Sequence, residues 1–402
     1  MAAPNVIVLL VVIATAVAML VRRLPVPYTV ALVLAGLILG AFHFVDAPHL
    51  TRSLLFAVFL PGLVFEAAFH LDGTRLRHNA GVVTALAVPG VVASIGLTAG
   101  VLLLLGHSLG AQALAWRGAL VFGAVVAATD PIAVVSLVRS LGAPPRLALL
   151  LEAESLLNDG TAIVFLGLVI TVVTGAGADA ATMVVAFVRV VGLGAVIGGA
   201  IGFGTSVLTL GVEESVIEIT LTLIAAYGSF VVAEQLGGSG VIATLVAGAI
   251  FGNYGARRAM SPAARTAAHS FWEYIAFLLN SIVFLLIGFE VRLSALIPRW
   301  PLIVASLAAA WVARLLIVGG VVAIGSRTRE RIPRAWTIPL AWGGLRGALS
   351  MVLALSLPDA IADRDVIVAA TTGFVLLSIV LQGSTMAPLL MAAGLTANST
   401  GN

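Results

Sequence analysis

Long apolar stretches alternate with short polar ones along the whole chain. A helix needs about 20 apolar residues to cross the hydrocarbon core of a bilayer, and the pattern predicts thirteen such spans. Their ranges are 4–21, 27–45, 53–71, 80–105, 117–138, 147–174, 181–210, 215–235, 239–252, 269–289, 300–323, 335–357 and 366–392. The loops between them are no longer than about 20 residues, so we expect no separate soluble domain.

Composition points to the same class of protein. Of the 402 residues, 61% are hydrophobic and 10% are charged, whereas soluble domains carry about 25% charged residues. We therefore expect an all-α polytopic membrane protein. The chain has no cysteine, which excludes disulfides and thiolate chemistry, and its scattered net charge of +3 does not favour binding of nucleic acid. All 21 basic residues are arginines, which do not deprotonate, so proton chemistry must fall on other side chains.

Arginine positions predict the orientation of the spans, because cytoplasmic loops are enriched in basic residues. With the N-terminus outside, the cytoplasmic side holds Arg22, Arg23, Arg75, Arg77, Arg139, Arg146, Arg257, Arg258, Arg265, Arg327, Arg329, Arg331 and Arg334. The outside then holds only Arg52, Arg117, Arg292, Arg299 and Arg364. We expect an outside N-terminus, a cytoplasmic C-terminus, and a first span that is retained, since its basic pair follows the apolar run.

Two spans carry helix-breaking signals at their middle. The fifth contains Thr129-Asp130-Pro131, and proline removes a backbone donor and disfavours helical geometry in the residue before it, which predicts a break near 128–130. The twelfth contains Gly343-Gly344-Leu345-Arg346-Gly347, which predicts an unwound segment. Either break alone is compatible with an ordinary kink. Two breaks seven spans apart, each with an ionisable residue, indicate an inverted-repeat transporter whose site lies where the breaks meet.

Polar residues gather in the sixth span, inside an otherwise apolar stretch. At 100° per residue, four of them share a face about 140° wide: Glu154, Ser155, Asn158 and Asp159. A charged side chain at this depth costs at least a few kcal/mol and is a functional-site hypothesis by default. The remainder of the helix is apolar, so we expect this face to line a buried site. Glu152, nearer the cytoplasmic end, is expected to be a solvated residue of a funnel.

A carboxylate removed from water holds a proton more tightly, and it can hold a proton or a small cation but rarely both. Oxygen ligands suit a hard cation such as Na⁺. Asp159, the Ser155 hydroxyl and freed carbonyls near Thr129 could supply them, with Asp130 beside the positive end of a half-helix. Glu66 in the third span is either a further ligand or a buried, protonated structural acid.

The remaining arginines, Arg189, Arg314 and Arg346, lie inside spans, and Arg314 must have a partner at that depth. We expect Arg314 to pair with Glu154, and Arg346 to offset the carbonyl ends of the broken twelfth span. These two charges leave one or two of the intramembrane carboxylates free to titrate. Asn280 and Ser281 in the tenth span are expected to join helices by hydrogen bonds. The six histidines lie near span ends or in loops and form no metal-ligand spacing.

Three of these strings together resemble a known family. Ala128-Thr129-Asp130-Pro131, Glu154-Ser155-Leu156-Leu157-Asn158-Asp159-Gly160 and Gly343-Gly344-Leu345-Arg346-Gly347 are similar to motifs of the monovalent cation:proton antiporters of the NhaP and sodium/proton-exchanger type. The resemblance covers essentially the whole chain. It implies an NhaA-like antiporter fold with two crossing unwound helices, a core transport domain at roughly 80–174 and 300–392, and a dimerisation domain at roughly 1–71 and 181–289.

The resemblance also implies roles for individual residues. Asp159 matches the aspartate that binds ion and proton, and Asn158 precedes it as in electroneutral members. Thr129, Asp130 and Ser155 match positions of the cation site, Glu66 matches an acid of the third span, and Glu154 with Arg314 matches a structural ion pair. Members are homodimers that work by an elevator-like movement. Because the chain ends about ten residues after the last span, we expect any pH response to reside in the transmembrane part.

The sequence therefore predicts an electroneutral Na⁺(Li⁺)/H⁺ antiporter of the cell membrane, and no enzyme. Asp159 would bind cation and proton competitively during alternating access. The expected partners are monovalent cations, protons, the lipid bilayer and a second copy of the chain, with no cofactor and no nucleic acid. The alternatives are a K⁺/H⁺ antiporter, more remotely a sodium-coupled symporter or a channel, and an intramembrane hydrolase using Asp130 and Asp159.

Overall fold

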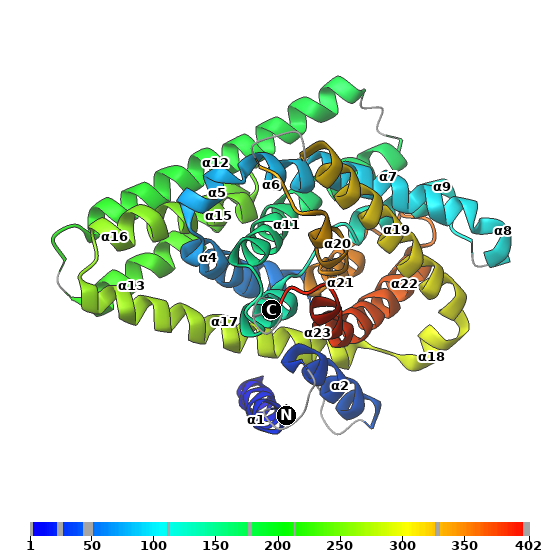
Figure 1. The fold of residues 1–402 in the computed structure, drawn as a ribbon, viewed down its shortest axis with the longest axis horizontal. Coiled ribbons are helices and arrows are strands. Elements are labelled where there is room, and N and C mark those ends of the chain that lie inside the picture. The colour runs from blue at the N-terminus through cyan, green and yellow to red at the C-terminus, as the bar shows by residue number, and fades with distance from the viewer. Residues whose placement is uncertain are drawn as a thin grey trace.

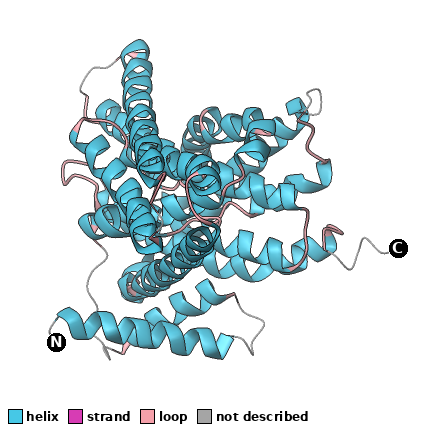
Figure 2. Cartoon of the chain, turned by 90° about the vertical axis from the view of Figure 1, so that its left-hand side faces the viewer, coloured by secondary structure: helices cyan, strands magenta, loops and turns pink. Residues whose placement is uncertain are grey.

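The computed structural model describes residues 3–21, 27–42, 51–110, 113–175, 179–212, 214–325 and 330–396. Helices form almost all of this part of the chain, and it contains no strand (Figure 2). Arg22, Arg23, Arg327 and Arg329, which enter the orientation argument, lie outside the described residues, as do His43 and His49.

The helices of the first half are α1 (Ala3–Val21), α2 (Tyr28–Ala41), α3 (Arg52–Leu54), η1 (Leu55–Phe59), α4 (Leu60–His70), α5 (Gly73–His78), α6 (Ala80–Ala87), α7 (Pro89–Leu104), α8 (Gly106–Leu109), α9 (Trp116–Val125), α10 (Ile132–Ser140), α11 (Pro145–Val173) and α12 (Ala180–Thr209). Those of the second half are α13 (Ser215–Leu223), η3 (Ile224–Gly228), α14 (Ser229–Gln235), α15 (Gly240–Ile250), η4 (Phe251–Gly255), α16 (Ala256–Arg258), α17 (Pro262–Glu290), α18 (Leu293–Leu296), η5 (Ile297–Arg299), α19 (Trp300–Gly325), η6 (Arg334–Trp336), α20 (Thr337–Trp342), α21 (Ala348–Leu355), α22 (Arg364–Leu377), η7 (Ser378–Gln382) and α23 (Gly383–Ala392).

Among the described residues, seven helical runs are long and apolar enough to cross a membrane. They are 80–104, 145–173, 180–209, 215–235, 262–290, 293–325 and 364–392. Four shorter apolar helices add to them, at Val8–Val21, Tyr28–Ala41, Leu55–His70 and Trp116–Val125. Most of these runs coincide with predicted spans to within a few residues. The helix Trp116–Val125 ends 13 residues before residue 138, the predicted end of the fifth span. The runs 262–290 and 293–325 begin seven residues before the predicted tenth and eleventh spans. The chain is a multi-pass membrane protein, and the total of thirteen crossings stays a prediction.

The polar helix α11 lies in the middle of the molecule (Figure 1). One group of helices, α4, α5, α12, α13, α15 and α16, lies on one side of it, and α7, α9 and α19–α23 lie on the other. Helix α17 runs along the lower edge of the view, with α1 and α2 beyond it. Because α11 contacts both groups, residues on its different faces meet different partners.

Small residues allow close packing of helices where lipid offers no hydrophobic drive for association. On α12, a glycine recurs every four residues at Gly194, Gly198 and Gly202, and it faces the backbone of the loop before α15 and of α15 itself. A β-carbon at Gly198 would overlap the carbonyl of Ala243. The α12–α15 contact therefore requires glycine at these three positions. Their four-residue spacing is already visible in the sequence.

Candidate functional site

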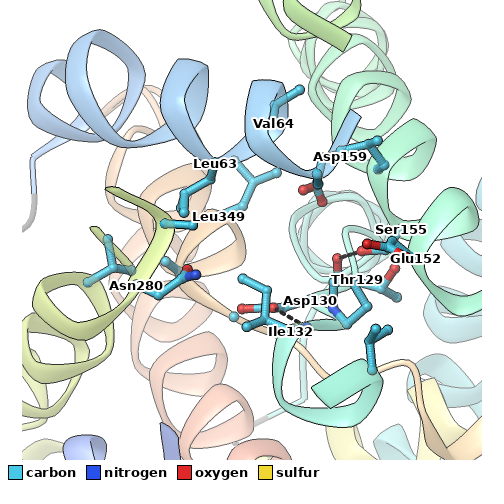
Figure 3. A pocket seen from close by; sticks show the side chains of 18 of the residues that line it. Leu63, Val64, Thr129, Asp130, Ile132, Glu152, Ser155, Asp159, Asn280 and Leu349 are labelled. Carbon is cyan, nitrogen blue, oxygen red and sulfur yellow. Dashed lines mark hydrogen bonds between the residues drawn. The ribbon is translucent and has the colours of Figure 1, made fainter. Parts of the chain in front are cut away.

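A cavity of about 380 Å³ lies where the two broken spans approach α11. Its wall is formed by α4, the segment 128–131, α10, α11, α17 and the start of α21. Figure 3 shows Asp159 projecting from α11 into this space, with Thr129, Asp130 and Ser155 nearby and Asn280 across from them. The cavity reaches as far as Arg139, whose side chain is 60% exposed.

The first break is present where the sequence predicts it, and it is longer than expected. Helix α9 ends at Val125 and α10 begins at Ile132, so residues 126–131 are not helical. Asp130 accepts a hydrogen bond on Oδ1 from the amide of Ile132, at 3.1 Å. Its carboxylate therefore lies at the N-terminus of α10, where the helix dipole favours negative charge.

The second break contacts the first. Helix α20 ends at Trp342 and α21 begins at Ala348. The amide of Asp130 donates to the carbonyl of Leu345 at 2.7 Å, so a free donor of one break satisfies a free acceptor of the other. A β-carbon at Gly347 would overlap the Asp130 carboxylate. Glycine at this position is what allows the second segment to pass so close to the acid.

Helix α11 satisfies other backbone groups of the first break. Ser155 donates from Oγ to the carbonyl of Thr129. Asn158 donates from Nδ2 to the carbonyl of Ala127 at 3.0 Å and to Oγ1 of Thr129 at 3.1 Å. Unpaired backbone groups are costly in a membrane, and these two side chains satisfy two of the carbonyls that the unwound segment leaves free.

Asp159 is the acid of α11 that lines the cavity without a partner for one of its carboxylate oxygens. Its Oδ1 atom is buried and has no hydrogen-bond partner among the described residues. A buried carboxylate oxygen without a donor is costly unless the group is protonated or binds a cation. The geometry therefore leaves this oxygen to a proton or a metal ion.

The polar residues of α11 do not share one site, and the prediction of a single polar face is wrong in this respect. Glu152, Ser155 and Asp159 line the cavity, and so does the apolar Leu156. Glu154 instead faces Arg314, while Asn158 lies behind the cavity wall. These polar residues span about 160° of the helix surface when Glu152 is included. Helix α11 packs against both helix groups, so residues at the two edges of this sector meet different partners.

Glu154 and Arg314 form a buried, bidentate ion pair. Arg314 Nη1 and Nη2 each lie 2.5 Å from a carboxylate oxygen of Glu154, and Nη2 also donates to the carbonyl of Leu340 at 3.3 Å. Glu154 is 1% exposed and Arg314 is 7% exposed. The pair joins α11 to α19 and, through Leu340, to the half-helix that precedes the second break.

Arg346 lies within the second break and is 3% exposed. Its Nη1 donates to the carbonyl of Gly344 at 3.2 Å, which is the kind of carbonyl contact expected from the sequence. It lines a separate, much smaller cavity together with Arg314 and Trp311. Arg346 therefore lies beside the site and does not line the large cavity.

Glu66 and Glu152 line the cavity, and each has a partner of its own. His70 Nδ1 lies 3.2 Å from Oε1 of Glu66, whose side chain is 24% exposed. Arg139 donates to Glu152 at 2.6 Å. Glu66 is thus neither fully buried nor isolated, and Glu152 is held by an ion pair rather than simply solvated.

Comparison with known proteins identifies the family. The profile of the family described as "Sodium/hydrogen exchanger, transmembrane" matches residues 7–392. The chain belongs to this family. It is therefore a membrane transporter and not an enzyme.

Several curated relatives of this exchanger are similar over most of its length. The Na⁺/H⁺ antiporter ApNhaP of Aphanothece halophytica is 40% identical over 92% of this chain and 70% of its own. NhaG of Bacillus atrophaeus is 36% identical over 98% of this chain and 75% of its own. NhaP of Pseudomonas aeruginosa is 37% identical over 84% of this chain and 80% of its own. Both of these are also named Na⁺/H⁺ antiporters.

A solved structure has the same fold as this exchanger. The sodium proton antiporter MjNhaP1 of Methanocaldococcus jannaschii superimposes with a TM-score of 0.78 and 21% identity, over 96% of this chain and 97% of that one. The all-helical antiporter fold expected from the sequence is confirmed by this match.

The cavity of the exchanger also contains a polar residue that sequence reasoning assigned elsewhere. Asn280 was expected to join helices, but it lies on the cavity wall opposite α11 (Figure 3). Its neighbour Ser281 does join helices, since its Oγ lies 2.8 Å from the hydroxyl of Tyr28 on α2. The two positions are 100° apart on α17, and only the packing of that helix decides which one faces the site.

Proposed function

We propose that this protein exchanges cytoplasmic Na⁺ or Li⁺ for external H⁺, one for one, across the cell membrane. The observation that carries the proposal is Asp159, which lines the cavity where the two breaks meet and whose buried Oδ1 atom has no donor among the described residues. Family membership and the names of the relatives support sodium and protons as the exchanged ions.

Competition at one carboxyl group couples the two ions. In this mechanism Asp159 binds Na⁺ when ionised, and protonation of the same group releases the metal ion. Either form can cross the membrane with the moving part of the protein, whereas the ionised and empty form cannot do so cheaply, because an isolated buried charge is strongly disfavoured. Exchange follows because the site crosses the membrane in either direction only when Asp159 has bound Na⁺ or a proton.

Neighbouring oxygens complete the proposed cation site. Ser155 donates its hydrogen to the Thr129 carbonyl, which leaves the lone pairs of its hydroxyl oxygen for a cation. Oxygens of Thr129 and Asp130 also lie beside the cavity. Na⁺ is a hard cation that favours such oxygen ligands. Glu66 is proposed to attract cations at the cavity wall.

The remaining site residues are proposed to hold the unwound backbone in place and to compensate buried charges, without binding the cation themselves. Asn158 holds the first break in its unwound form through its two hydrogen bonds. Glu154 and Arg314 stabilise the core, and Arg346 compensates negative charge near the second break. No cofactor takes part in this mechanism.

Movement of one domain against another would carry the site across the membrane. We assign residues 80–174 and 300–392 to the moving core, and 1–71 and 181–289 to a dimerisation domain of a homodimer. With the N-terminus outside, Arg139 and Glu152 lie toward the cytoplasm. The cavity that they line is then an inward-facing approach to Asp159.

The test of this proposal is the Asp159→Asn variant in proteoliposomes. We expect loss of Na⁺- and Li⁺-dependent proton movement, because an amide can neither release a proton nor balance a cation. The control is Asp359→Asn, whose carboxylate is 98% exposed and which should exchange normally. Na⁺, Li⁺ and K⁺ are added in turn; normal exchange in Asp159→Asn, or a response to K⁺ alone in the parent, would refute the proposal.

A further inference from the structure

Backbone groups at the second break are held by the last helical run, α22–η7–α23, which is the next run after the broken span α20–α21. The amide of Arg346 donates to Oγ of Ser378 at 3.1 Å. Ser378 in turn donates to Oε1 of Gln382, and Nε2 of Gln382 donates to the carbonyl of Trp342 at 3.0 Å. One continuous relay therefore connects the residue where α20 ends to the residue before Gly347.

The relay is buried and its geometry depends on an irregular turn. Ser378 is fully buried and Gln382 is 6% exposed. They are the first and last residues of the π-helical turn η7, a feature that occurs frequently at functional sites. Trp342 adds a third link, since its indole Nε1 donates to Oγ1 of Thr385 at 2.9 Å.

The first break is held in a corresponding way. There too the helix that follows the broken span supplies two polar side chains, Ser155 and Asn158, which bind the free carbonyls of Thr129 and Ala127. The two pairs have similar spacing, three residues on α11 and four on η7. Ser378 and Gln382 thus do for the second break what Ser155 and Asn158 do for the first.

We propose that Ser378 and Gln382 are positioning residues for cation binding, which fix the second break so that Leu345 and Gly347 hold Asp130 in place. The contacts that transmit this effect are the hydrogen bond from the Asp130 amide to Leu345 and the close approach of Gly347 to its carboxylate. Neither relay residue lines the large cavity. This inference rests on the proposed function, because it takes Asp130 as part of the cation site.

The test compares Ser378→Ala and Gln382→Met with Ser384→Ala in proteoliposomes. Ser384 lies on the same helical run, is exposed, and bonds only to its own helix at Val380 and Leu381. Each relay variant leaves a buried group at the break without its partner, so the KM for Na⁺ should rise about five- to tenfold, the factor that corresponds to one lost hydrogen bond. Vmax should change less than the KM, and Ser384→Ala should match the parent in both.

Three further measurements separate positioning from general loss of stability. Ser378→Thr restores the hydroxyl and should bring the KM back toward the parent value. The Ser378→Ala/Gln382→Met double variant should raise the KM by less than the product of the single effects, because both act on one segment. Protection by Na⁺ against thermal unfolding, which needs no transport, should weaken in parallel with the KM. If Ser378→Ala does not fold, Ser378→Cys keeps a weak donor and acceptor and should give an intermediate KM.

The inference is overturned if the relay variants unfold at lower temperature while the KM and the Na⁺ protection stay at parent values. Asp159→Asn is measured alongside them. Loss of exchange in Asp159→Asn together with a normal KM in the relay variants would refute the positioning role alone. Full exchange in Asp159→Asn would refute the proposed function itself.

Discussion

At the scale of single residues, the contrast between neighbouring positions of α11 is the most informative feature. Glu154 has an arginine that satisfies both carboxylate oxygens, whereas the Oδ1 atom of Asp159 has no protein donor. Two acids five residues apart on one helix are thus given opposite tasks. The first is saturated by its partner, and the proposed mechanism assigns the second to bind the exchanged ion.

This contrast predicts that loss of the Glu154–Arg314 pair harms folding more than ion affinity. Removal of one partner from a buried ion pair leaves an uncompensated charge and costs about 3–5 kcal/mol. Glu154→Ala and Arg314→Ala should therefore lower the unfolding temperature and the yield of folded protein. The matched control is Glu152→Gln, which removes a carboxylate of the same helix whose partner Arg139 is largely exposed. An abundant, stable Arg314→Ala variant with only a shifted KM would count against a structural pair.

Some site residues are predictable from sequence because their signals are local. Thr129-Asp130-Pro131 specifies a break by backbone chemistry alone, and a carboxylate such as Asp159 inside an apolar stretch is conspicuous. Asn280, Ser378 and Gln382 carry no such signal. Polar residues of that kind occur at many helix contacts, and their roles depend on the rotation of α17 and η7 against the break, which periodicity does not determine.

At the scale of elements, the two unwound segments act as one unit. Their contact consists of the Asp130–Leu345 hydrogen bond and the packing of Gly347 on the Asp130 carboxylate. The breaks themselves follow from proline and glycine in the sequence. The contact between the breaks does not follow from the sequence, because two segments more than 200 residues apart in the chain must meet.

The contact between the two breaks predicts a specific effect of Gly347→Ala. The added β-carbon would overlap the Asp130 carboxylate, and crowding of this kind typically costs about 1–3 kcal/mol. We expect severe loss of exchange because the acid is displaced. The controls are Gly96→Ala and Gly319→Ala, in other spans, where a β-carbon meets no atom within 4 Å. Exchange activities that are equal in all three variants would show that the two breaks do not need this contact.

At the scale of the whole molecule, α11 lies between two groups of helices (Figure 1) and contacts both. Its residues bond to α19 on one side and to the first break on another, and they line a cavity shared with α4 and α17. The sequence predicts the spans and the family well, since hydropathy and motifs are properties of the chain. It does not predict which helices enclose the cavity.

The one-for-one stoichiometry predicts that transport is independent of membrane voltage. A net charge moved across the membrane couples to about 2.3 kcal/mol per 100 mV, which would change rates strongly. Initial rates of Na⁺/H⁺ exchange should stay the same when potassium gradients with an ionophore impose inside-negative or inside-positive potentials. Rates that follow the sign of the imposed voltage would require more than one proton per sodium ion.

The pH dependence of Na⁺ binding to the purified protein tests competition at Asp159 most directly. Binding is measured by calorimetry, without transport, in parent and Asp159→Asn. If cation and proton share this carboxylate, the Kd for Na⁺ rises by about tenfold for each unit that pH falls below the range in which the group ionises, and one proton is released for each Na⁺ bound. A Kd that stays constant while pH falls, or an Asp159→Asn variant that binds Na⁺ with the parent's pH dependence, would contradict the account.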